Sequence, residues 1–126
     1  MATRSTIAIE QTDGTVRQVY CHWDGYLEHV GQVLLDNYQT PGVVGELISF
    51  GDISSLEERI VETCFYGRDR GETECGFVQF DSFESYKANH QYEEFEYIFR
   101  TDGNWYVSQY ESEYTLLEEE LDQVRG

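Results

Sequence analysis

Basic residues are scarce in this 126-residue chain. Eight lysines and arginines stand against 25 aspartates and glutamates, giving a formal net charge of −17 and an isoelectric point near 4.2. A field of this sign repels nucleic acids and anionic membranes, which excludes direct binding to either, and it attracts basic proteins or cations. An alternative interpretation is that the acidity serves only solubility or tolerance of high salt.

Proline is nearly absent, and paired cysteines and long apolar runs are missing. With one proline and no Gly/Ser-rich linker, repeat or low-complexity tract, the chain is predicted to form one domain over residues 1–126. Three cysteines without framework spacing indicate free thiols in a reducing compartment. No run reaches transmembrane length and the start lacks the apolar core of a secretory signal, so we expect an intracellular protein.

Recognisable catalytic motifs are absent as well. The sequence contains no nucleophile elbow, phosphate loop, dinucleotide fingerprint or HExxH pair, so we expect a protein that is not an enzyme and needs no cofactor. The residues of metal-ligand type lack the short paired spacing of zinc sites, and we expect no metal. These residues are Cys21, His22, Cys64, Cys75 and His90. Adjacent strand residues diverge, so His22 cannot activate Cys21 as a nucleophile.

The alternation of residues predicts strands at both ends of the chain. Runs at 6–10 and 16–23 flank an Asp13-Gly14 turn, and runs at 95–99 and 105–107 flank a second turn, so two hairpins are expected. A short strand is expected at 77–80. In the second run, Val19, Cys21 and Trp23 should face the core, while Tyr20, His22 and Asp24 face outward.

Helical spacing and capping residues predict the remaining elements. Apolar positions recur over 26–38, and Thr40-Pro41 is typical of a helix start that buries Val44, Leu47 and Ile48 before Gly51. Cap patterns begin further helices at Ser54, at 81–84 running towards Tyr92, and at Thr115. The last should bury Leu117, Leu121 and Val124. The predicted fold class is α+β: a single domain with an antiparallel β-sheet and helices packed on it.

The acidity increases towards the C-terminus. Residues 81–126 carry twelve acidic and three basic residues. Carboxylates displayed on a hairpin and helix can imitate duplex DNA, which carries one charge per ~1.7 Å. A solvated acidic face is the alternative. The predicted partner-binding surface comprises Glu93, Glu94, Glu96, Asp102, Glu111, Glu113, Glu118, Glu119, Glu120 and Asp122. Ten tyrosines exceed what such a core needs, which suits a protein-binding surface and leaves a homodimer open.

A glycine-rich segment, GRDRGETECG at 67–76, is predicted to be an exposed loop. Its Arg68 and Arg70 could bind a small anion through their guanidinium forks, with His22 and Asp24 completing a nucleotide-binding site. Local ion pairing with the neighbouring acids, which would pin the loop, is the competing interpretation.

Several motifs together mark a resemblance. ATRSTIAIE, YCHWDGY, GQVLLDNY, GDISSL and YGRDRGE, between residue 2 and about residue 72, resemble a family of small phage and prophage proteins, with a looser EYIF…WYVS similarity further on. The resemblance implies a phage accessory protein acting in the host cytoplasm. Such proteins often resemble inhibitors of host defence, including DNA mimics that bind a nucleic-acid-binding complex, while others resemble sponges for nucleotide signals.

Overall fold

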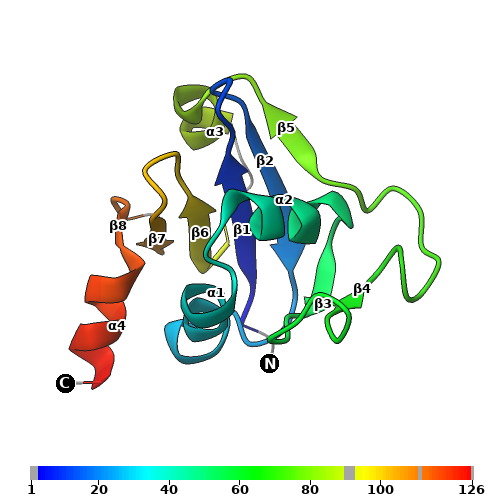
Figure 1. Cartoon of the computed structure of the whole chain (residues 1–126), viewed down its shortest axis with the longest axis horizontal. Coiled ribbons are helices and arrows are strands. Elements are labelled where there is room, and N and C mark those ends of the chain that lie inside the picture. Colours follow the sequence, from blue (N-terminus) through cyan, green and yellow to red (C-terminus); the bar gives the residue numbers. More distant parts are fainter. Residues whose placement is uncertain (1–2, 90–92, 111, 126) are drawn as a thin grey trace.

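The computed structural model describes residues 3–89, 93–110 and 112–125. In these residues eight strands form one mixed sheet, accompanied by four α-helices and one π-helical turn (Figure 1). The strands are β1 (Ser5–Glu10), β2 (Val16–Cys21), β3 (Ile53–Ser55), β4 (Cys64–Phe65), β5 (Val78–Phe80), β6 (Phe95–Phe99), β7 (Trp105–Gln109) and β8 (Thr115–Leu116). The helical elements are η1 (Leu27–Gly31), α1 (Gln32–Asn37), α2 (Pro41–Ser49), α3 (Phe83–Asn89) and α4 (Leu117–Arg125).

The strand order is β4-β3-β2-β1-β6-β7-β8, with β5 pairing β2 beside this path. Both predicted hairpins are confirmed, because β1 pairs β2 and β6 pairs β7 antiparallel. The prediction of an antiparallel sheet is wrong, since β1 pairs β6 in parallel and β2 pairs β3 in parallel. Two strands that pair in parallel need a long connection between them, and the chain has one between β1 and β6 and another between β2 and β3.

One sheet face contributes to the main core. Ile7 and Ile9 of β1, Val19 and Cys21 of β2, and Tyr97 of β6 belong to one buried cluster with apolar residues of the helical elements. The helical members of that cluster are Leu27, Val30, Leu34, Val44, Leu47, Ile48, Leu117 and Leu121. The predicted helical stripes over 26–38 and after Thr40 are therefore confirmed. In Figure 1, α2 crosses in front of β1 and β2.

The opposite face carries a smaller cluster. Ala8, Val16 and Ile98 of the sheet pack with Tyr86 of α3. Ser82 caps α3, accepting a hydrogen bond from the Ser85 amide at 3.0 Å, in line with the predicted start. The helix runs to Asn89, and the predicted end at Tyr92 lies outside the described residues.

Three local predictions are wrong, and at Ser54 the cause is a tertiary contact that prevails over the local pattern. The segment at Ser54 forms strand β3 rather than a helix, because its backbone pairs with β2 and β4. Trp23 is 44% exposed, since β2 ends at Cys21 and the alternation stops there. Val124 is 51% exposed, although Leu117 and Leu121 of the same helix are buried as predicted.

Candidate functional site

The acids predicted on the last helix are on the surface. Glu118, Glu119 and Asp122 of α4 are exposed, as is Glu113 before it. Glu120 is half-buried and accepts a hydrogen bond from the Thr115 hydroxyl at 3.0 Å. This part of the predicted partner-binding surface is therefore available to another molecule.

Most of the described acids predicted on the hairpin are at least partly buried. Glu96 is a correction, because it is 1% exposed: β6 lies between β1 and β7, and alternation turns Glu96 towards the face covered by Tyr86. Glu93 and Glu94 are half-buried. Asp102 is exposed in the β6–β7 turn and accepts a hydrogen bond from the Tyr106 hydroxyl, which lowers the pKa of its carboxyl. Glu111 lies outside the described residues.

The structure adds acids that the sequence pattern did not assign to this surface. The π-helical turn and α1 pack against α4, and the Leu117 side chain lies beside Gly31. Glu28 of η1 and Asp36 of α1 are exposed. Glu28 is also close enough to the buried Tyr97 phenol to contribute to its raised pKa, although burial is the main cause. We define the acidic helical face as Glu28, Asp36, Glu118, Glu119 and Asp122.

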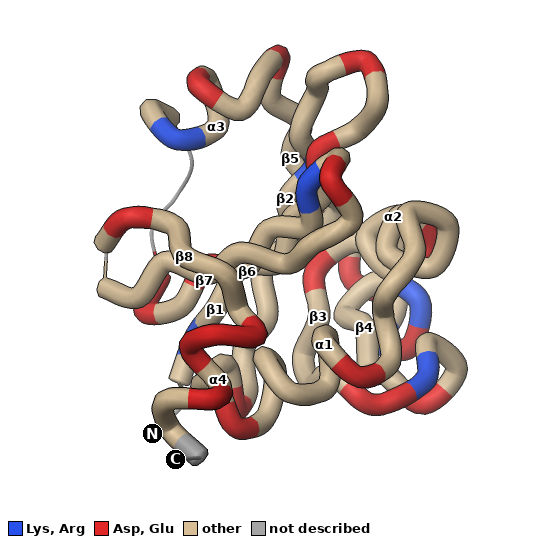
Figure 2. The backbone as a smooth tube through the Cα atoms, turned by 60° about the vertical axis from the view of Figure 1, so that its left-hand side comes forward, with Lys and Arg blue, Asp and Glu red and all other residues tan. Residues whose placement is uncertain are grey.

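The basic residues, apart from Arg125 at the end of α4, lie outside the elements that carry this face. Neither 18–58 nor 101–124 contains a lysine or arginine, and Figure 2 shows acidic positions gathered along α4, which ends at Arg125. Six of the eight bases have side-chain partners elsewhere, and these pairs are Arg17 with Gln79, Arg59 with Glu62, Arg68 with Asp69, Arg70 with Ser54, Lys87 with Glu84 and Arg100 with Glu10. The absence of lysine and arginine from residues 18–58 is the feature of the sequence that could have indicated Glu28 and Asp36 as part of this face.

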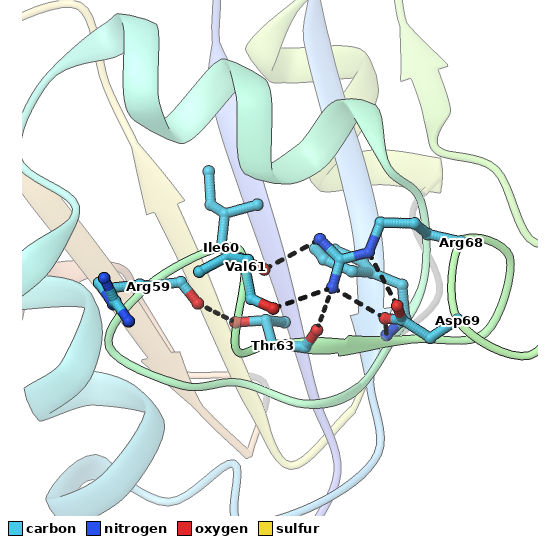
Figure 3. A network of polar contacts seen from close by, with 7 residues as sticks. Arg59, Ile60, Val61, Thr63, Arg68 and Asp69 are labelled. Carbon is cyan, nitrogen blue, oxygen red and sulfur yellow. Dashed lines mark hydrogen bonds and ion pairs between the residues drawn. The ribbon is translucent and has the colours of Figure 1, made fainter.

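Arg68 holds a turn together rather than presenting its charge (Figure 3). Its guanidinium donates to both carboxylate oxygens of Asp69, at 2.9 and 3.0 Å, and to the carbonyl oxygens of Ile60, Val61 and Thr63, at 3.0, 3.4 and 2.7 Å. It also lies 4.6 Å from the centre of the Phe65 ring. These contacts match the ion-pairing interpretation of the loop.

The four residues proposed for an anionic ligand are not joined in the structure. Among the described residues, His22, Asp24, Arg68 and Arg70 share no hydrogen bond or ion pair with one another. The His22 Nδ1 lies 2.6 Å from the Tyr20 hydroxyl. Arg70 donates to the Ser54 hydroxyl at 3.2 Å. Asp24 is exposed at a left-handed φ of 56°. A nucleotide site built on these residues stays a prediction, and Arg68 is already engaged in the turn.

The YCHWDGY segment forms a corner between sheet and helix. Cys21 is fully buried in the core cluster, while His22 is half-buried, so their side chains diverge as predicted. After the strand ends, the Asp24 carbonyl accepts the Val30 amide and the Gly25 carbonyl accepts the buried Tyr97 hydroxyl at 2.6 Å. These bonds fix the start of η1 and therefore the position of Glu28.

Burial makes Cys21 the least reactive of the three thiols. Desolvation raises the pKa of Cys21 to about 12 from a usual value near 9. Because the folded-state pKa is the higher one, the stability linked to this thiol is full below pH 9 and is lost as the pH rises towards 12. We expect iodoacetamide to modify the half-buried Cys64 and Cys75 in the native protein at neutral to mildly alkaline pH, and Cys21 only in urea.

Peptide mapping by mass spectrometry measures this difference. Modification in urea provides the control that all three thiols can react. Native-state alkylation of Cys21 at the rate of the other two would show that β2 opens locally, contrary to its position in the core.

Comparisons with protein families, curated proteins and solved structures found no match. Among the described residues, no cluster of three or more histidines, cysteines, aspartates or glutamates is placed to hold a metal ion. No helix in the same residues has the length and apolar character needed to cross a bilayer.

Proposed function

We propose that this protein is a non-enzymatic binding protein whose acidic helical face docks onto a basic, nucleic-acid-binding protein. The observation that carries the proposal is charge separation: exposed carboxylates occur on η1, α1 and α4, which pack against one another, while the described bases other than Arg125, the last residue of α4, lie on other elements. Carboxylates without nearby cations repel one another, and a basic partner removes that repulsion while steering the encounter.

Mimicry of duplex DNA is the specific form of this proposal. Glu118, Glu119 and Asp122 span four residue steps of a helix that rises about 1.5 Å per residue, so three charges lie within about 6 Å of helix axis, a charge density of the same order as the one charge per about 1.7 Å of duplex DNA. The target would be a protein with a basic groove for nucleic acid. In the phage context implied by the sequence motifs, this would be a host defence complex in the cytoplasm.

Neutralising the face is the direct test. The triple variant Glu118→Gln, Glu119→Gln and Asp122→Asn removes three charges without changing side-chain size greatly. We expect the wild type to capture nucleic-acid-binding proteins from a host lysate at about 50 mM salt and to release them at about 200 mM or on addition of duplex DNA. The face variant should retain less than a tenth of this captured protein.

A second triple variant controls for the loss of net charge. Glu46→Gln, Glu72→Gln and Asp81→Asn removes three exposed charges on α2 and in the loops before β5 and α3, outside the elements of the face, and should capture as much as the wild type. Equal capture by both variants would contradict a localised binding face, and capture that duplex DNA does not compete would contradict mimicry.

A further inference from the structure

A small polar cavity lies at the sheet edge where two strands diverge. Strand β2 pairs with β5 through residues 16–18 and with β3 only at Cys21, so Tyr20 lies between the two pairings. The Asp52 carboxylate replaces a strand partner there, accepting the Tyr20 amide at 2.9 Å. The opening beside this contact has a volume of 160 Å³.

The cavity is lined by acids from three separate segments. Asp52 precedes β3, Glu74 lies in the loop before β5, and Glu93 precedes β6. No lysine or arginine contributes to this described lining. Asp52 and Glu93 are half-buried, and burial raises the pKa of both carboxyls, although the charge of Arg4 offsets part of the rise at Glu93. Burial of this kind strengthens the attraction between a carboxylate and a cation.

A buried amide in the wall points to a ligand independently of the acids. Gln18 lines the cavity, is only 6% exposed, and its Nε2 has no hydrogen-bond partner among the described residues. Buried polar groups without partners are uncommon in folded proteins, and they often mark the place of a ligand or an ordered water. Because the Nε2 has no partner to lose, rotation about the last torsion of the side chain can direct either the oxygen or the nitrogen into the cavity.

We propose that this cavity binds a guanidinium group. A guanidinium presents five N–H donors in a plane, which suits carboxylates arriving from several directions together with the Gln18 oxygen. It is also less strongly hydrated than an ammonium group, so it enters a shielded site more readily. The volume equals about five water molecules at about 30 Å³ each, enough for one head group but not for a whole nucleotide.

This site is separate from the acidic helical face. Thr6 and Gln18 line the cavity, and alternation directs them away from Ile7 and Val19, which belong to the core beneath the helices. The guanidinium could come from a free metabolite or from an arginine side chain of a partner. The chemistry is the same in both cases, and the experiment distinguishes the sources.

Methylguanidinium is the probe, and N-methylurea is its uncharged counterpart of similar shape. At constant ionic strength, we expect methylguanidinium to cause saturable shifts in the backbone amide NMR signals of residues 18–20, 52 and 76–78. N-methylurea should not. A short arginine peptide that binds more tightly than free arginine assigns the source to a partner's side chain, whereas equal affinities assign it to a metabolite.

Two variants test the carboxylates. Asp52→Asn keeps an acceptor for the Tyr20 amide, and Glu93→Gln changes a half-buried side chain outside any described strand. Each should weaken methylguanidinium binding at least about tenfold, the expected effect of losing one charged hydrogen bond. Glu46→Gln, an exposed acid on α2, should leave binding unchanged.

Several results would overturn the proposal. One is that both cavity variants fold and bind as the wild type does; another is that N-methylurea shifts the same signals equally. Shifts that rise linearly and spread over the acidic surface would indicate general attraction of cations and would also exclude the site. Unchanged amide spectra of the unliganded variants provide the folding control.

Discussion

Replacing Gly51 by alanine is expected to lower the free energy of unfolding by about 3–5 kcal/mol. Gly51 ends α2 at a left-handed φ of 85°, which costs a residue with a side chain about 1–2 kcal/mol. An added Cβ would also lie 2.3 Å from the Cys75 carbonyl oxygen, which is too close for any real contact.

The close contact between an added Cβ and the Cys75 carbonyl also affects residues beyond Gly51. The same Cys75 carbonyl accepts the Asp52 amide at 2.7 Å, which ties the 67–76 loop to the start of β3. Moving the Cys75 backbone away from a new methyl group weakens that bond and shifts a segment that leads into β5. Both the strain and the lost contact therefore fall on the region that holds the sheet edge together.

Gly103 supplies a matched control for the strain alone. It has nearly the same φ, 84°, but an added Cβ there would meet nothing within 4 Å. Urea denaturation of both variants should give a loss of about 1–2 kcal/mol for Gly103→Ala and at least twice that for Gly51→Ala. Equal losses would mean that the loop is not packed against Gly51 in solution.

Arg68→Ala is expected to lower the free energy of unfolding by about 2–4 kcal/mol. The side chain is 28% exposed, and the substitution removes the donor to three carbonyl oxygens and to Asp69 at once (Figure 3). It also removes a cation lying 4.6 Å from the Phe65 ring centre. The Asp69 carboxylate, which still accepts the Phe65 amide at 2.8 Å, would lose the neighbour that lowers the pKa of its carboxyl.

Arg59 is the matched control because it lies in the same turn and also pairs with an acid. Its side chain is 71% exposed, and among the described residues it forms one ion pair, with Glu62 across the surface. Arg59→Ala should leave the urea midpoint unchanged, as is usual for exposed pairs. Arg68→Lys should fall between the two, since an ammonium keeps the charge but cannot bridge carbonyls in several directions. If Arg68→Ala had the same free energy of unfolding as the wild type, the loop would not depend on this network of hydrogen bonds.

Local patterns in the sequence predicted most of the elements. The Asp13-Gly14 turn, the Thr40 cap with Pro41 and the alternation of Phe95, Tyr97 and Phe99 each act within a few residues, so neighbouring residues suffice to indicate them. The hydrophobic positions of the helix at 26–38 are buried as its spacing required. The exposed acids of the last helix were predicted for the same reason.

Neighbouring residues could not reveal which distant segment covers a given face. Alternation indicated that Glu96 and Phe95 point in opposite directions, but only the position of β6 between β1 and β7, with Tyr86 above, makes Glu96 buried. Likewise, Ser54 has a capping pattern, yet pairing with β2 and β4 makes it part of a strand. Long-range contacts prevailed over local propensity at both positions.

The sequence by itself determined the strongly negative charge, the local elements and the divergence of Cys21 from His22, because these depend on composition and on periods of two and 3.6 residues. Tertiary structure decided the parallel pairings, the joining of Glu28 and Asp36 to the acids of α4, the engagement of Arg68 and the cavity around Gln18. Each of these depends on residues far apart in the chain, whose distances are set only when the whole sheet and its helices pack together.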